Sequence, residues 1–164
     1  MRYLFFLSAL VLTLASCSNV AFVKPQPEGI EALAEIPENL QGIYAFDTAS
    51  CTACDSIIVT SNTIGEDTLG KNLIVKKRGN YYYLNFLEEN GYDLTVVKVI
   101  QFLNYEFFKI YHPNISEKNA YFFDVIKVEA SSISNKYLID NVSINQMRIM
   151  LRKTKDNHKL IRIK

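Results

Sequence analysis

Short runs of apolar residues alternate with turn-forming residues along the chain from Gly42 to its C-terminus. The runs are rich in Val, Ile, Tyr and Phe, which favour extended backbone, so each run predicts a strand. The expected strands cover residues 43–47, 56–61, 72–78, 81–89, 92–103, 105–111, 121–130, 137–140, 143–152 and 159–164. Between them, Arg78-Gly79-Asn80 and Glu89-Asn90-Gly91 predict tight turns, and the second is the strongest hairpin signal in the chain.

The segments between the expected strands are short, and no long helical pattern separates one strand from the next. Parallel strands need such crossovers, so the sheet should be mostly antiparallel. Many short strands in one domain predict an all-β fold, either an up-and-down β-barrel or a two-sheet β-sandwich. We expect the barrel, because consecutive hairpins link residues 72–103 without a long return connection.

The pattern at the N-terminus is different. Arg2 is the only charged residue before Lys24, and a largely apolar run, residues 3–15, follows it. A basic start, an apolar run and then small residues are the anatomy of a signal peptide. The run is shorter than the roughly 20 residues that a membrane-spanning helix needs, so cleavage is expected rather than insertion.

The apolar run closes with Leu14-Ala15-Ser16-Cys17, which resembles the lipobox of bacterial lipoproteins. The resemblance implies cleavage before Cys17, a lipid thioether on its sulfur and acylation of the new N-terminus, as with palmitate. Several acyl chains hold a protein firmly at a membrane surface. Ser18 stands where an Asp is the inner-membrane retention signal in one Gram-negative sorting system, so the implied location is the cell outer membrane, facing the periplasm. An ordinary secretory signal with a chance cysteine is the alternative.

The expected organisation is a signal peptide over residues 1–16, a Pro-containing tether over 17–27 and one β-rich domain over 28–164. The 18 basic and 17 acidic side chains nearly balance, so no net charge predicts a nucleic-acid partner. Acids dominate residues 25–70, however, and bases dominate 147–164. We expect the first and last strands of the domain to lie side by side; a basic tail that touches anionic lipid or envelope polymer is the alternative.

A second resemblance lies on the first expected strand of the domain. Leu40-Gln41-Gly42-Ile43-Tyr44 is similar to the Gly-x-Trp opening motif of lipocalin-like barrels, with Tyr44 in place of the tryptophan. In that family the aromatic residue closes the floor of the barrel and packs under a basic side chain from the last strands. The resemblance implies that Arg148 or Arg152 fills this place.

Catalytic chemistry lacks its usual residues in this chain. His112 and His158 are the only histidines, and both lie in expected turns. No phosphate-binding loop, dinucleotide fingerprint, nucleophile elbow or His-Glu-x-x-His motif occurs. We therefore expect no enzymatic activity, cofactor or metal site.

Cys51 and Cys54 form the one local motif with possible chemistry, Cys-x-x-Cys. A redox motif of this type normally begins a helix after a strand, whereas these cysteines lie between two expected strands. Zinc would require two more ligands. Because lipidation of Cys17 leaves an even pair in an oxidising compartment, a disulfide between Cys51 and Cys54 is the expected state, with redox and zinc chemistry as alternatives.

Aromatic residues are concentrated in residues 81–123. Strand alternation places Tyr82 and Phe86 on one face and Tyr81 and Tyr83 on the other. We expect a packed core with tyrosine hydroxyls at its rim. The alternative is a lined cavity for an apolar or sugar-like ligand.

Together these features predict a membrane-anchored lipoprotein of the bacterial cell envelope, with a non-catalytic binding or structural accessory domain. The expected partners are the membrane, through lipid on Cys17, and an envelope protein or an apolar ligand. A lipocalin-like carrier of a hydrophobic small molecule is the alternative function.

Overall fold

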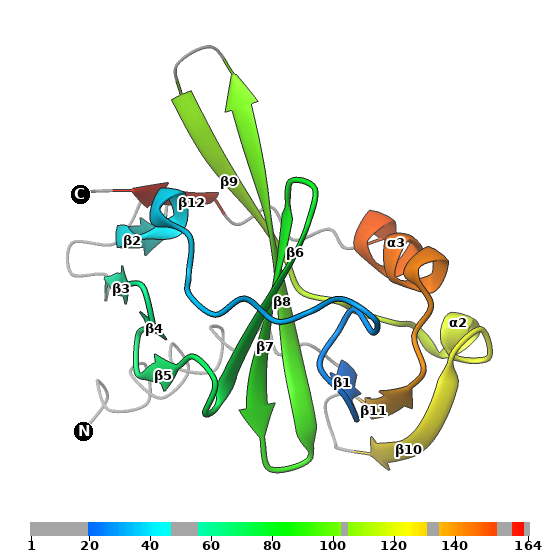
Figure 1. Cartoon of the computed structure of the whole chain (residues 1–164). Coiled ribbons are helices and arrows are strands. Elements are labelled where there is room, and N and C mark those ends of the chain that lie inside the picture. The colour runs from blue at the N-terminus through cyan, green and yellow to red at the C-terminus, as the bar shows by residue number, and fades with distance from the viewer. Residues whose placement is uncertain (1–19, 47–55, 103–104, 131–134, 154–158, 163–164) are drawn as a thin grey trace, which may run out of the picture.

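The chain was analysed as a computed structural model, which describes residues 20–46, 56–102, 105–130, 135–153 and 159–162. It is mostly β, with the two α-helices on one side (Figure 1). The strands are β1 (Val20–Phe22), β2 (Gly42–Phe46), β3 (Ile57–Val59), β4 (Thr63–Ile64), β5 (Asp67–Thr68), β6 (Leu73–Arg78), β7 (Tyr81–Glu88), β8 (Gly91–Phe102), β9 (Tyr105–Tyr111), β10 (Asp124–Ala130), β11 (Asn135–Asp140) and β12 (Lys159–Arg162). The helices are η1 (Glu38–Leu40), α2 (Glu117–Ala120) and α3 (Ile144–Lys153).

Strand β8 organises the sheets. Hydrogen bonds join the strands in the order β10-β11-β1-β8-β9-β12-β2-β3-β4-β5, with β7 on the other edge of β8 and β6 beyond β7. Hydrogen bonds thus link all twelve described strands, which are arranged as two sheets, one of 7 strands and one of 4. With 12 residues, β8 is about 40 Å long, so two strands share one of its edges: β1 pairs at Tyr92 and β9 pairs over 96–102.

The all-β class is confirmed, but the sheets do not close into a barrel, and the arrangement fits the two-sheet alternative. A physical reason lies at the free edge of β6. The backbone N–H of Leu33 donates to the carbonyl of Val75 (2.8 Å), and that of Ile36 donates to the carbonyl of Ser61 (2.7 Å). The segment 32–36 thus occupies the space between β6 and the β3–β4 turn, where a barrel would pair strand with strand.

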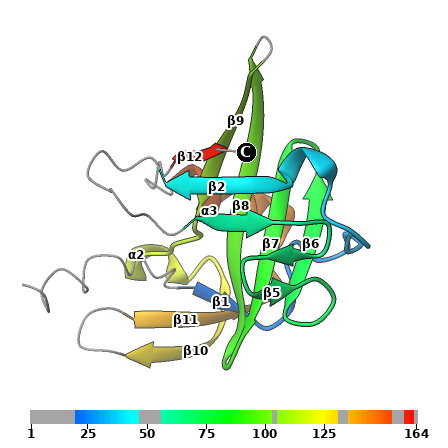
Figure 2. The same cartoon turned by 90° about the vertical axis from the view of Figure 1, so that its left-hand side faces the viewer.

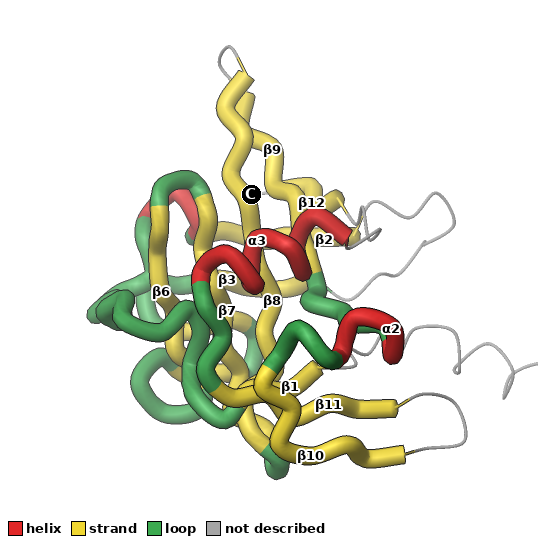
Figure 3. Tube along the Cα trace, turned by 90° about the vertical axis from the view of Figure 1, so that its right-hand side faces the viewer, coloured by secondary structure: helices red, strands yellow, loops and turns green. Residues whose placement is uncertain are grey.

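Two hydrophobic cores lie on opposite faces of β8, because successive side chains of a strand alternate. Leu94 and Val96 pack in one core, which also contains β1, β11 and the inner face of α3. Val97 and Val99 pack in the other core, inside the curved larger sheet. Figure 3 shows α3 and α2 on the side of the first core.

The expected tether is only partly a separate segment, because its described residues, 20–27, are folded into the domain. All three residues of β1 are buried, and β1 lies between β11, which is parallel, and β8, which is antiparallel. The next residues are also held: the buried Lys76 donates through Nζ to the carbonyls of Pro25 (2.8 Å) and Pro27 (2.9 Å). Residues 20–27 therefore pack against the strands of the domain that was expected to begin at residue 28.

Local strand predictions agree well with the structure over residues 72–111, but β1, β4 and β5 were not predicted and the segments near the C-terminus differ. Both predicted hairpins form, β6–β7 around Gly79-Asn80 and β7–β8 around Glu89-Asn90. The expected strand 143–152 is instead the helix α3, and the expected strand 121–130 begins only at Asp124, after α2. Strands β2 and β12 pair side by side, as expected for the segments 43–47 and 159–164. The paired residues of β2 are Phe46, Ala45 and Tyr44, which carry no charge, so this pairing does not join opposite charges.

No helix within the described residues is long and apolar enough to cross a membrane.

In Figure 2, β1, β11 and β10 lie below α2, and β2 and β12 lie above it.

Candidate functional site: a basic, tyrosine-lined cavity

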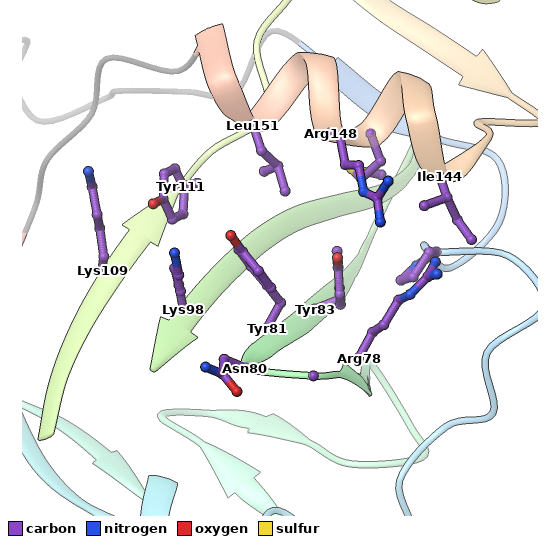
Figure 4. A pocket seen from close by; sticks show the side chains of 13 residues that line it. Arg78, Asn80, Tyr81, Tyr83, Lys98, Lys109, Tyr111, Ile144, Arg148 and Leu151 are labelled. Carbon is purple, nitrogen blue, oxygen red and sulfur yellow. The ribbon is translucent and has the colours of Figure 1, made fainter. Parts of the chain in front are cut away.

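An open cavity of about 790 Å³ lies between α3 and the strands β7, β8 and β9 (Figure 4). We call it the basic cavity. It is lined by Pro27, Arg78, Gly79, Asn80, Tyr81, Tyr83, Lys98, Lys109, Tyr111, Ile144, Met147, Arg148 and Leu151.

The register of the sheet places the polar side chains that line the cavity on one face of strands β7, β8 and β9. Tyr81 pairs with Lys98, which pairs in turn with Lys109, so these three form one cross-strand row. Tyr83 and Tyr111 belong to the next row, on either side of Val96. Cross-strand partners project from the same face of a sheet, and the first core lies on this face too.

The hairpin turn and the helix complete the walls. Arg78 ends β6 just before the two-residue turn Gly79-Asn80, where Gly79 adopts the positive φ of 57° that such turns require. On α3, the lining residues Ile144, Met147, Arg148 and Leu151 recur at helical spacing, so they lie on one face of the helix. Figure 4 shows Arg78 and Arg148 extending toward each other, with Tyr83 beside them.

Within the part of the chain that the structure describes, the cavity is lined by basic side chains and by no acidic one. Four of its lining residues are basic, Arg78, Lys98, Lys109 and Arg148, and none is acidic. Among the described residues, the ion pairs are those of Lys24 with Glu28 and Asp140, so none involves these four. Lys98 and Lys109 are direct cross-strand partners, and like charges in such pairs reduce stability. An anionic ligand bound among these side chains would therefore reduce a repulsion that the domain without ligand retains.

Each of the two lysines lies over a tyrosine ring. The Lys98 Nζ is 5.3 Å from the Tyr81 ring centroid, and the Lys109 Nζ is 5.3 Å from that of Tyr111. These distances lie within the range of cation–π attraction. The rings thus hold the ammonium groups at the cavity without neutralising them.

Tyr83 lies at the base of the cavity and is buried. Burial raises the pKa of its hydroxyl, while Arg78 and Arg148 act in the opposite direction. The hydroxyl therefore stays protonated at neutral pH and can donate a hydrogen bond to an anion between the two arginines.

A second cavity, of about 190 Å³, lies inside the curved larger sheet; we call it the apolar cavity. Its wall includes Leu40, Tyr44, Ile57, Val59, Ile64, Leu84, Phe86, Val97, Phe108 and Ile110, together with two polar residues, Thr95 and His112. The Thr95 hydroxyl lies 3.3 Å from the His112 Nδ1. On the same strand face, burial raises the pKa of Asp93, while His112 lowers it.

Most of the chemically distinctive residues of the sequence lie outside the described part. Cys17, Cys51, Cys54 and His158 all fall there, so lipidation and the disulfide stay predictions. His112 is described, and it contacts Thr95 rather than lying in a solvated turn. Within the described ranges, no group of three or more His, Cys, Asp or Glu residues could hold a metal ion.

The residues of the lipocalin-like motif are placed differently from the expectation. Tyr44 is buried edge-to-face against Phe108, with ring centroids 5.4 Å apart, and its hydroxyl donates to the Leu40 carbonyl (2.8 Å). The base near this strand is Arg162, which donates to the Gln41 carbonyl. Arg148 instead lines the basic cavity, because it lies on a helix and not on a closing strand.

The sequence did not reveal the basic cavity as a site. Its bases come from the three strands β6, β8 and β9 and from the helix α3, and only the tertiary fold brings them together. The one available signal was the presence of Lys98 and Lys109 within two strands that are mostly apolar.

Comparison of the chain with protein-family models, with curated proteins and with solved structures finds no match. The assignment of function therefore depends on the site itself.

Proposed function

We propose that this protein is a lipid-anchored, non-catalytic binding domain of the bacterial cell envelope, and that its ligand is an anionic saccharide bound in the basic cavity. The observation that carries the proposal is the set of four basic side chains, without a lining carboxylate, around three tyrosines. Arginine pairs with phosphate or carboxylate through two parallel hydrogen bonds, so Arg78 and Arg148 suit one anionic group.

The tyrosines favour a ring-bearing ligand over a bare inorganic ion. Tyr81 and Tyr111 present aromatic faces and hydroxyls to the cavity, and tyrosine combines an apolar surface with a polar tip. A sugar offers apolar ring faces and hydroxyls that match both properties. The cavity volume of about 790 Å³ falls within the range that encloses small organic ligands.

The non-catalytic assignment follows from the residues that line the cavity. They include no carboxylate, imidazole or thiol, and these groups carry most general acid–base and nucleophilic catalysis. The lipid anchor is supported by the leader and by Leu14-Ala15-Ser16-Cys17. Labelling of the chain with palmitate in cells should disappear in a Cys17→Ala variant, and label that persists would contradict the anchor.

The binding proposal is tested by titration calorimetry on the soluble form that starts at Ser18. N-acetylglucosamine 1-phosphate should bind, and neutral N-acetylglucosamine should bind much more weakly. Arg148→Gln should weaken binding of the phosphate about 10- to 100-fold, because a hydrogen bond to a charged group contributes about 1.5–3 kcal/mol. The control Lys71→Gln removes one exposed positive charge outside the cavity and should have little effect. Equal losses in both variants, or equal binding of both sugars, would contradict the proposal.

The apolar cavity supports a second candidate function, transport of a small hydrophobic molecule. It is open to solvent on one side and lined mostly by aliphatic and aromatic side chains, and an apolar cavity of about 150 Å³ suffices for a ligand the size of benzene. Native mass spectrometry of the soluble form distinguishes the two functions. A carrier retains an apolar ligand through purification, whereas the saccharide-binding domain is recovered without one.

A further inference from the structure

We propose that the ligand of the basic cavity is a segment of an acidic polysaccharide, not a single sugar, and that its successive anionic units contact the two ends of the cavity. One end is formed by Arg78 and Arg148, and the other by Lys98 and Lys109. We call them the arginine end and the lysine end. This inference rests on the saccharide-binding function proposed above and specifies the length and charge pattern of the ligand.

The sheet register arranges the basic residues of the strands in a line. Arg78 on β6 pairs with Tyr81 on β7, and Tyr81 pairs in turn with Lys98 on β8. Lys98 pairs with Lys109 on β9, and beyond β9 the strand β12 continues the line with Lys159 opposite Lys109. Because neighbouring strands lie about 4.8 Å apart, the backbone positions of Arg78 and Lys109 are separated by about 14 Å along the sheet. The strands thus provide a line of basic positions rather than a compact cluster.

The side chains of this line do not converge on one point. Figure 4 shows Arg78 and Arg148 extending toward each other at the arginine end. Lys98 and Lys109 lie at the lysine end, and Tyr81 stands between the two pairs. A single anionic group at the arginine end leaves the repulsion between the paired lysines in place. A second anionic group, on a neighbouring sugar unit, reduces that repulsion.

Helix α3 runs along the same line and forms the opposite wall of the cavity. It has 10 residues and is therefore about 15 Å long, which matches the span of the basic line. Figure 4 shows Ile144 toward the arginine end and Leu151 toward the lysine end. Together with Met147, these side chains line the cavity and offer apolar surface to the faces of sugar rings. The cavity is thus elongated and suits a linear ligand.

Acidic residues are kept away from this line in the described part of the chain. Strand alternation places the acids of strands β6 to β9 on the face away from the cavity, and they are Glu88, Asp93 and Glu106. Helix α3 contains no acidic residue. Glu28 follows the lining residue Pro27, but it forms an ion pair with Lys24 (3.3 Å). The charges along the line therefore favour a chain of negative groups over its whole length.

A single-stranded nucleic acid is the competing linear polyanion. The 18 basic and 17 acidic side chains of this protein nearly balance, whereas domains that bind nucleic acids usually carry a clear excess of bases. Such proteins also stack successive bases on free aromatic rings. Of the cavity tyrosines, Tyr83 is buried, and Tyr81 and Tyr111 each lie against a lysine ammonium group. A saccharide chain is therefore the favoured ligand.

Titration calorimetry tests the inference on the protein as cells produce it, purified in detergent. The probes are galacturonic acid and its linear trimer, which carry one carboxylate on each sugar. The trimer should bind about 10- to 100-fold more tightly than the monomer, because it adds hydrogen bonds to the charged groups of the lysine end. Maltotriose, a neutral trimer, should bind much more weakly than trigalacturonate. Equal affinities of the galacturonate monomer and trimer would overturn the inference.

Paired variants test where the added affinity arises. Lys98→Gln/Lys109→Gln should remove most of the gain from monomer to trimer and should weaken trigalacturonate more than N-acetylglucosamine 1-phosphate. The variant also removes a repelling pair, so it should fold, and circular dichroism verifies this. The control Lys71→Gln/Lys118→Gln removes two exposed charges outside the cavity and should retain the gain. A full gain in the first variant, or the same loss in both, would contradict a role for the lysine end.

The probes also separate the possible failures. If neither N-acetylglucosamine 1-phosphate nor trigalacturonate binds, the proposed function fails and this inference fails with it. If the sugar phosphate binds in an Arg148-dependent manner but the galacturonate trimer gains nothing over the monomer, only this inference is wrong. A thymidine oligonucleotide with the same number of charges should bind more weakly than trigalacturonate. Tighter binding of the oligonucleotide would indicate a nucleic-acid ligand and would also overturn the proposal.

Discussion

Single polar residues in the interior of the domain hold together segments that are far apart in the chain. Asn85, fully buried on β7, is the clearest example. Its Oδ1 accepts the backbone N–H of Gln26 (2.6 Å), and its Nδ2 donates to the carbonyls of Gln26 (2.9 Å), Ile74 (3.2 Å) and Tyr83 (3.2 Å). One side chain therefore satisfies the backbone of the segment after β1.

Asn85→Ala should lower the free energy of unfolding by about 2–4 kcal/mol, because it leaves the buried N–H and carbonyl of Gln26 without partners. Urea unfolding of the soluble form, followed by circular dichroism, measures this change. The matched control is Asn145→Ala, at an exposed position on α3, which should change stability by less than about 0.5 kcal/mol. Similar effects at both positions would contradict the structural role of Asn85.

The sequence predicted where Asn85 lies but not its role. Strand alternation placed it on the same face as Tyr81 and Tyr83, and its cross-strand partner Leu94 belongs to the first core that these tyrosines line. Its partner Gln26, however, is 59 residues away in the chain, and no local pattern announces that contact. The same limit applies to the basic cavity, whose charges meet only through the tertiary fold.

Among the elements, local signals worked best where a turn joined two strands. Gly79-Asn80 and Asn90-Gly91 lie at real hairpin turns because turn geometry is encoded by adjacent residues. Helix α3 was missed, although its signals are also local. Ile144, Met147 and Leu151 recur at helical spacing, but the β-branched residues in this stretch favoured a strand prediction.

The start of α3 contains a reciprocal cap that tests its helical identity. The Ser143 N–H donates to the Gln146 Oε1 (2.9 Å), and the Gln146 N–H donates to the Ser143 Oγ (3.3 Å). Ser143→Ala should therefore cost about 1 kcal/mol in unfolding free energy, whereas Ser143→Asp should retain most of the stability. Thermal unfolding of both variants measures the difference. An Asp variant as unstable as the Ala variant would contradict the cap.

At the scale of the whole molecule, the distribution of strands between two sheets could not be read from the sequence. Consecutive hairpins predict a closed barrel equally well. The outcome depends on two long-range choices: the segment 32–36 occupies the free edge of β6, and β1 joins β11 beside β8. Neither contact can be recognised from a local sequence pattern. The all-β class was therefore confirmed, whereas the prediction of a closed barrel was wrong.

Because β1 joins the smaller sheet to β8, a core substitution in it should destabilise the whole domain. Phe22 is fully buried, and Phe22→Ala should lower the free energy of unfolding by about 3–5 kcal/mol. The adjacent Val23 is 38% exposed, so Val23→Ala serves as the control and should cost less than about 1 kcal/mol. Urea titrations of the two variants decide the point. A small effect at Phe22 would mean that β1 is a detachable tether after all.

The position of β12 affects the order in which the larger sheet can form. This strand follows all the other described strands in the sequence, yet it lies inside the larger sheet, between β9 and β2. While the chain emerges in order, β2 and β9 have no strand between them, and their facing edges stay open. The larger sheet can be completed only after residues 159–162 have been made, so its completion has to follow the synthesis of all the other described strands.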